Sequence, residues 1–242
     1  AGQGPVEGES ELGGDGQDPS SDAVRATLLD VMGQVHREIG DVDEAVRLCG
    51  DSVALRRRLH PDGHVDLAVA ETNYSLALHA SGRFEEAESH AREALRVLAS
   101  LPAAPTAERV LAHNNLGAVL LTRGRMSEAE AQFRESLRLA GETHARDSAE
   151  ACIALDNLGE LERQRGNLDA AADIASESLE RIRAAFGEDH PRTLTAENNL
   201  AAVWTDAGRL EDAARRLEMV LERARRVHGD RSAIVALTLE NL

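Results

Sequence analysis

The 242-residue sequence lacks lysine, has few aromatic side chains and contains no long apolar run. All 27 basic residues are arginine, and the aromatic residues are three Phe, one Tyr and one Trp. Because alanine and leucine are abundant, the composition suits thin layers of closely packed helices better than a deep globular core. A membrane span needs about 18 consecutive apolar residues, and neither such a run nor a charged leader is present, so we expect no membrane partner.

Cysteine is also scarce, and acidic residues outnumber basic ones. Cys49 and Cys152 are far apart and fall at different positions of the repeat described below, which indicates neither a disulfide nor a metal knuckle. We therefore expect a reducing, cytoplasmic setting. The formal net charge of -16 disfavours nucleic acid and anionic membranes as partners, because both need a basic surface. Abundant Ala, Gly and Arg point to a GC-rich, bacterial genome.

Residues 1–22 differ in composition from the rest of the chain. They hold six acidic side chains, no basic one and many glycines. Such a segment buries too little apolar surface to offset its ordering entropy, so we interpret it as a disordered acidic linker. The alternative is that it lies in a groove as a pseudo-ligand, either of its own array or of a neighbouring molecule.

From residue 23 onward the sequence repeats with a step of 42 residues. One glycine column and one asparagine column run through the chain without a gap, which is strong evidence for a tandem repeat. The glycines are Gly40, Gly82, Gly124, Gly166 and Gly208, and the asparagines are Asn73, Asn115, Asn157, Asn199 and Asn241. Residues 23–242 therefore hold five full units and the start of a sixth.

Each unit is predicted to be a helix A, a tight turn at the glycine and a helix B. Glycine suits the residue after helix A, where a left-handed backbone favours a residue without a Cβ. Acidic or hydroxyl residues follow in the first turn of helix B, and an alanine column five residues after the glycine lets the two helices approach closely. On helix A, apolar residues three apart, such as Leu116 and Val119, form one face. The expected fold class is all-α.

These residues resemble the tetratricopeptide repeat, whose usual period is about 34 residues. The longer unit, the Asn-Asn-Leu run of helix A and the link Gly187-Glu188-Asp189-His190-Pro191 resemble kinesin light chain and its bacterial relatives. The link around His64 is a degraded version, and two further links lack the histidine. The resemblance implies a right-handed α-solenoid in which the A helices line a concave groove.

The asparagine column is the main candidate for function. It stands one position before the core leucine, so in the resembled fold it faces the groove, and a carboxamide offers the donor and acceptor that match a peptide unit. A ladder of such residues could hold an extended peptide of any sequence. The structural alternative is that each asparagine bonds to the neighbouring A helix or caps a local amide.

Other groove positions would select the peptide sequence, with an apolar middle and charged ends. These positions are Arg37, Leu76, His79, Leu111, Asn114, Leu121, Asp156, Glu160, Arg163 and Asn198. Members of the family that clamp a free C-terminus carry basic residues at the positions of Leu111 and the asparagines, so binding of a chaperone tail is not expected.

Catalytic motifs are missing from the sequence. His60 and His64 could form half of a metal site, but no HExxH context accompanies them, and the link motif explains them better. No phosphate loop or nucleophile motif occurs, so we predict no enzyme activity, cofactor or metal.

We expect a scaffold that binds an extended protein segment, with self-association as a further possibility. The alternatives are the sensor arm of a larger signalling protein, favoured by the non-Met start and the end within a sixth unit, and an enzyme acting in the superhelical cavity.

Overall fold

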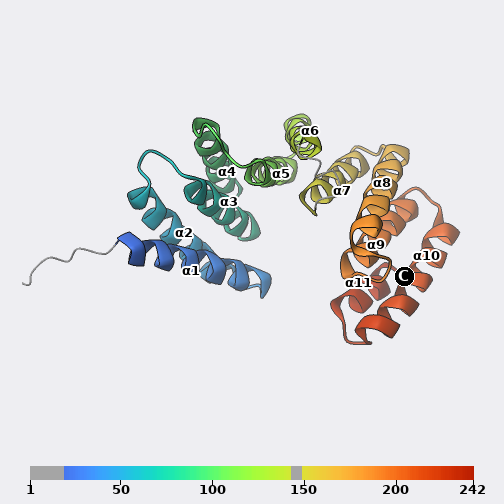
Figure 1. Ribbon diagram of the computed structural model, residues 1–242. Coiled ribbons are helices and arrows are strands. Elements are labelled where there is room, and N and C mark those ends of the chain that lie inside the picture. The colour runs from blue at the N-terminus through green and yellow to red at the C-terminus, as the bar shows by residue number, and fades with distance from the viewer. Residues whose placement is uncertain (1–18, 143–148) are drawn as a thin grey trace, which may run out of the picture.

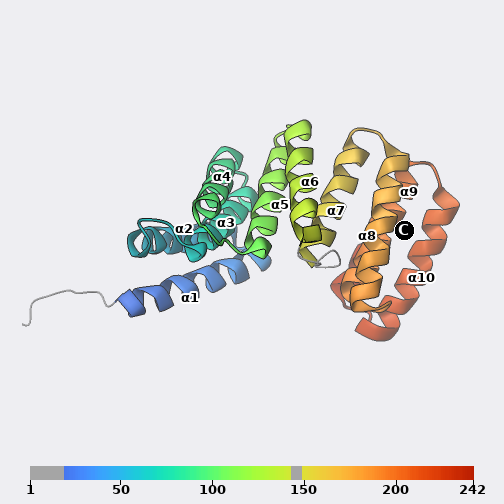
Figure 2. The ribbon, with the colours of Figure 1, turned by 45° about the horizontal axis from the view of Figure 1, so that its top comes forward.

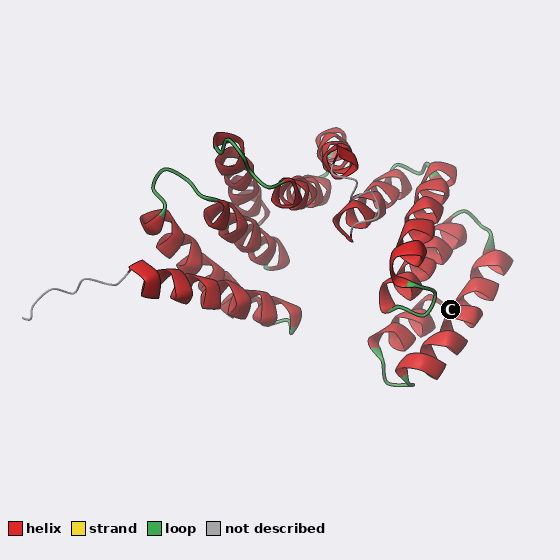
Figure 3. Ribbon diagram, in the orientation of Figure 1, coloured by secondary structure: helices red, strands yellow, loops and turns green. Residues whose placement is uncertain are grey.

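The computed structural model describes residues 19–142 and 149–242, and this part of the chain consists of helices joined by turns, without a strand (Figure 3). The eleven helices of these described residues follow one another along an arch, as five successive pairs and a last single helix (Figure 1). The expected all-α solenoid is therefore confirmed.

The A helices lie along the inner side of the arch and the B helices along its outer side (Figure 1). The A helices are α1 (Pro19–Glu38), α3 (Val65–Ala80), α5 (Thr106–Thr122), α7 (Ala149–Gln164), α9 (Pro191–Asp206) and α11 (Ala233–Asn241). The B helices are α2 (Val42–Leu59), α4 (Phe84–Ser100), α6 (Met126–Glu142), α8 (Leu168–Phe186) and α10 (Leu210–His228). Each of the four inner A helices, α3, α5, α7 and α9, packs on the B helix of its own unit and on that of the preceding one (Figure 2).

The glycine column ends the first five A helices in the same way. At Gly124, φ is 72°, in the left-handed region that glycine adopts without strain. The Gly124 amide donates to the Leu121 carbonyl and the next amide, that of Arg125, donates to the Leu120 carbonyl, at 2.9 Å each. This pair of bonds is the Schellman motif, and the other four turns repeat it. The glycines therefore satisfy the last helical carbonyls and reverse the chain.

Helices A and B approach each other through a second column of small residues. At Gly117, an added Cβ would stand 2.4 Å from Cε1 of Phe133, a fully buried ring on α6. At Gly159 in the next unit, the nearest atom would be Cγ2 of Ile174 at 3.6 Å, because Ala175 takes the position of the phenylalanine. The size of the B-helix side chain at the position of Phe133 thus decides whether a side chain larger than that of glycine fits at the facing position of helix A.

Two of the links start an A helix with a histidine cap. Nδ1 of His64 accepts from the amide of Asp66, and Nδ1 of His190 accepts from the amide of Arg192, at 3.2 Å in both cases. Pro191 occupies the first turn of α9, where a missing amide hydrogen costs no helical bond. The two links that the sequence places in register therefore perform the same structural task.

Helix α1 begins at Pro19, four residues before the predicted start of the array, and Asp22 lies 3.5 Å from Arg58 of α2. The remainder of the predicted linker lies outside the described residues. Among the described helices, none combines the length and apolar character that a membrane crossing requires.

Candidate functional site

Neighbouring A helices are joined on the inner side of the arch by side-chain hydrogen bonds that span 43 residues, one more than the repeat. These bonds join Thr72 to Asn115, His79 to Thr122, Arg163 to Asp206 and Asn198 to Asn241. The sequence period predicts which residues are equivalent, but it does not predict these contacts between units.

The first two members of the asparagine ladder are buried or half-buried. Asn115 is 5% exposed, and its Nδ2 donates to the carbonyl of Thr72 on α3 at 3.4 Å, while its Oδ1 is buried without a partner. Asn73 is half-buried, and its Nδ2 is also buried without a partner. For Asn115, the geometry is that of the structural alternative, in which the carboxamide contacts the neighbouring A helix.

The later members of the ladder are more open. Asn199 and Asn241 are exposed and line a cavity of about 500 Å³ between α7, α9 and α11. Nδ2 of Asn241 lies 3.4 Å from Oδ1 of Asn198. Asn157 is half-buried on α7. The cavity exists here because α7 and α9 pack against each other less closely than the other neighbouring A helices do.

Charged side chains surround this cavity, and carboxylates outnumber the single arginine among them. Arg163 pairs with Glu160 of its own helix and, across the cavity, with Asp206 of α9 at 2.7 Å. Hydrogen bonds to Glu160 and Asp206 raise the pKa of Arg163 further above its usual range. Asp156 and Glu240 complete the charged lining.

Asp156 stands at the wall between the cavity and α8. Its Oδ1 accepts from the Ser178 hydroxyl at 2.6 Å. Burial raises the pKa of Asp156 above its usual value, and the hydrogen bond from Ser178 opposes that shift. Three groove positions predicted from the sequence, Asp156, Glu160 and Arg163, therefore meet in one cavity with Asn199 and Asn241.

Three other predicted groove residues are buried. Leu121 is 9% exposed and belongs to the core cluster around Phe133. Asn114 is 4% exposed. Asn198 is fully buried, and its Nδ2 donates to the Leu194 carbonyl and to the Thr238 hydroxyl of α11.

The remaining predicted positions lie in the first half of the arch. Leu111 is exposed and, with Asn73, lines a small cavity of about 50 Å³ between α3 and α5. Leu76 and Arg37 are half-buried. His79 bonds to Thr122 at 2.8 Å, and burial lowers its pKa. The structure does not bring these four into the cavity at α7, α9 and α11.

Buried carboxylates are a feature that the sequence reasoning missed. Glu197 is 1% exposed and pairs with Arg183, Arg216 and Arg223. Glu71, three repeats earlier, is fully buried and pairs with Arg57 and His90, which are equivalent in register to Arg183 and Arg216. The sequence could have predicted these clusters, because the acidic residue of helix A and the basic residues of the flanking B helices recur together at equivalent positions of two units.

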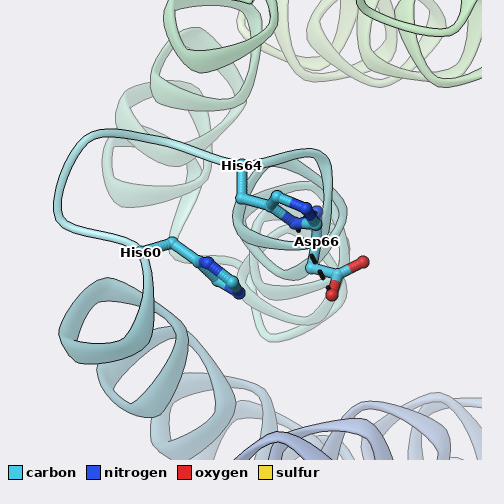
Figure 4. Close-up of side chains that lie close together, drawn as sticks. All are labelled: His60, His64 and Asp66. Atoms are coloured by element: carbon cyan, nitrogen blue, oxygen red, sulfur yellow. Dashed lines mark hydrogen bonds and ion pairs between the residues drawn. The ribbon is translucent and has the colours of Figure 1, made fainter.

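His60, His64 and Asp66 lie close together at the first link (Figure 4). Their potential ligand atoms all lie within 4.8 Å of one another, and the two rings stack with centroids 4.3 Å apart. Burial, and secondarily the neighbouring His64, lower the pKa of His60. At the equivalent link between α8 and α9, Phe186 stacks on His190 in the same way, with ring centroids 4.8 Å apart. Since phenylalanine cannot bind a metal, the stack is explained as part of the link.

Comparison with known proteins agrees with this architecture. A family model described as the tetratricopeptide repeat matches residues 24–100, 108–180 and 150–226. No curated protein matches the chain. Among solved structures, the fold is similar to a putative kinesin light chain of Podosopora anserina with nearly identical TPR-like repeats, at 19% identity and a TM-score of 0.67 over 89% of this chain and 100% of that one.

Two further structures show the same fold. BtubC (BKLC) from P. vanneervenii is 19% identical, with a TM-score of 0.73 over 88% of this chain and 84% of that one. The Rap conjugation gene regulator of the plasmid pLS20, solved in complex with a Phr peptide, is 17% identical, with a TM-score of 0.70 over 91% of this chain and 60% of that one. Since the family model matches most of the sequence, the chain belongs to the tetratricopeptide repeat family, and its long units are similar to kinesin light chain repeats.

Proposed function

We propose that this array is a non-enzymatic scaffold that binds an extended segment of a partner protein in the cavity between α7, α9 and α11. The observation that supports this most directly is the cavity itself, which offers about 500 Å³ and is lined by two members of the asparagine ladder. Pockets of several hundred Å³ are typical of binding sites, and repeat arrays of this family serve mainly as interaction scaffolds. No motif for catalysis competes with this proposal.

Backbone recognition would come from the carboxamides. Asn199 is exposed in the cavity and is free to turn its amide toward a bound chain. Asn241 would exchange its long bond to Asn198 for a bond to the peptide. Each hydrogen bond contributes roughly 0.5–1.5 kcal/mol net. Each asparagine would therefore increase the affinity for the peptide, and the loss of one would not abolish binding.

The charge of the cavity selects a basic segment. Asp156, Glu160, Asp206 and Glu240 face one arginine, Arg163, which is already paired with two of them. A lysine or arginine of the partner would pair with the carboxylates that Arg163 leaves unsatisfied. The net charge of the chain strengthens the attraction and makes it sensitive to salt.

A peptide display library is the experiment that tests this function. Peptides that the chain enriches are synthesised, and their affinities are measured by fluorescence anisotropy for the wild type and for Asn199→Ala. We expect enrichment of peptides with a Lys or Arg, and a loss of affinity of about three- to thirtyfold in Asn199→Ala, equivalent to one or two lost hydrogen bonds.

Asn167→Ala is the matched control, because Asn167 is exposed at the start of α8, outside the cavity, where its side chain bonds to Glu162. This variant should bind peptides as the wild type does. Equal affinities of wild type and Asn199→Ala, or enrichment of acidic peptides only, would contradict the proposal.

A regulatory arm of a signalling protein is the second candidate function. The similarity in fold to the Rap regulator, whose structure holds a peptide, supports it. In that case binding of the peptide would change the activity of a further domain. Thermal stabilisation of the array by the enriched peptides fits both candidates, whereas a peptide-dependent change in a linked domain would be specific to this one.

A further inference from the structure

The first helix of the array exposes a continuous apolar face. Six large apolar side chains of α1 and of the residue that follows it are between 47% and 70% exposed, and they recur at intervals of three, four or one along one side of the helix. They are Val24, Leu28, Val31, Met32, Val35 and Ile39. Together they present on the order of 500 Å² of apolar surface, which is at the upper end of what a monomer leaves uncovered.

Part of this face is buried in the inner units. Met32 and Val35 are 47% and 50% exposed, whereas their equivalents in α5, Leu116 and Val119, are 4% and 0% exposed. The preceding unit packs against each of α3, α5 and α7 through both of its helices. End units of soluble repeat arrays ordinarily carry polar residues on the outer face. Helix α1 therefore has the surface of an inner unit.

The sequence next to α1 does not supply the missing cover. Links between the units of this array are only a few residues long, as between Leu59 and Val65. A preceding B helix would therefore fall within residues 1–18. These residues contain only Val6 and Leu12 as large apolar side chains and are rich in glycine and acidic residues.

The spacing of the exposed residues is symmetric along the helix. The six positions lie in pairs at equal distances from the midpoint between Val31 and Met32. The pairs are Val24 with Ile39, Leu28 with Val35, and Val31 with Met32. A second α1 laid antiparallel about this midpoint would place an apolar residue at the level of each apolar residue of the first. Such a self-complementary surface is what a two-fold symmetric interface requires.

We propose that α1 is the interface of a homodimer, in which the exposed faces of two copies pack antiparallel about a two-fold axis near Val31 and Met32. Each copy then provides the apolar cover that an inner unit receives from its predecessor. The dimer joins two arches at their first units. Helices α7, α9 and α11 lie toward the other end of each arch from α1 (Figure 1). Because these helices line the cavity, the dimer would be bivalent.

Sedimentation of the full chain tests the dimer directly. We expect a monomer-dimer equilibrium with a Kd in the micromolar range, about 1–100 µM. Val31→Asp should weaken it at least tenfold, because two carboxylates would meet near the axis. Met219→Asp, a similarly exposed methionine on α10, should leave it unchanged.

Several results would overturn the proposal. A chain that stays monomeric up to about 100 µM would mean that residues 1–18 or a different protein cover α1. A dimer that persists in folded Val31→Asp would place the interface elsewhere.

Engineered cysteines test the antiparallel register without disturbing the fold. Burial raises the pKa of Cys49 to about 11, and Cys152 is also buried, so the native thiols should stay unreactive. Val31→Cys should cross-link to itself. Val24→Cys alone should not, because the two copies of position 24 would be about 22 Å apart at 1.5 Å per residue.

Mixing Val24→Cys with Ile39→Cys should restore cross-linking, since these positions face each other across the axis. Self-cross-linking of Val24→Cys at the efficiency of the mixture would refute the antiparallel arrangement. Circular dichroism of each variant shows that it is folded before it is compared.

Discussion

Replacing Gly117 by alanine should destabilise the array, although alanine is the better helix former. Alanine gains about 1 kcal/mol of helix propensity over glycine. Against this, its Cβ would stand 2.4 Å from Cε1 of Phe133, and that ring is rigid and 0% exposed. Overpacking a filled core costs roughly 1–3 kcal/mol or more. We therefore expect a net loss of about 1–2 kcal/mol in the free energy of unfolding, measured by urea denaturation.

Gly159→Ala is the matched control for this prediction. It occupies the same column one unit later, and its new Cβ would meet Ile174 at an ordinary 3.6 Å. This variant should gain about 0.5–1 kcal/mol. If Gly117→Ala is as stable as Gly159→Ala, the argument from close approach is wrong.

A double-mutant cycle isolates the contact itself. Phe133→Ala alone should cost about 3–5 kcal/mol because it leaves a cavity in the core. Adding Gly117→Ala to it should cost nothing further or should stabilise, because the ring that the methyl group would meet is gone. Strictly additive effects of the two substitutions would show that Gly117 and Phe133 do not interact.

Three further predictions concern polar groups. Burial lowers the pKa of His79 and of His113, so these histidines bind protons more readily in the unfolded chain than in the folded one. Urea midpoints should therefore fall as the pH drops below about 6.5, and a constant midpoint from about pH 7.5 to 5.5 would contradict this. Glu197→Gln should lower the free energy of unfolding by roughly 2 kcal/mol, because three arginines lose their buried partner; an unchanged urea midpoint would show that the cluster is neutral. Asn115→Ala should cost about 1 kcal/mol of stability, whereas Asn199→Ala should melt like the wild type, since only the former is buried between helices; equal melting curves would refute the distinction.

Register was the most reliable guide to the local structure. Gly40 and its equivalents end the A helices because a left-handed residue is required at that place, and this requirement is local to the turn. The equivalence of His64 and His190 likewise predicted two matching links, and both histidines cap a helix. Turns and helix caps of this kind depend on a few neighbouring residues, so they can be predicted directly from the sequence.

The inner surface was harder to predict. The asparagine column is uniform in sequence, yet Asn115 is buried against α3 while Asn199 opens into the cavity. The difference depends on how far apart successive A helices stand, and that spacing is set by the summed packing of both helix layers. The burial of Leu121 and Asn198, both expected to line the groove, has the same cause.

By itself, the sequence determined the repeat, the positions of the turns and the pairing of helices A and B, because each follows from a periodic pattern of small, apolar and capping residues. Only the tertiary structure decided where the inner surface opens and which members of the asparagine ladder remain available. It also decided that α1 exposes Met32 and Val35, whose equivalents in α5 are buried. The physical reason is that a column defines one position within a unit, whereas exposure depends on the neighbouring units that pack against it.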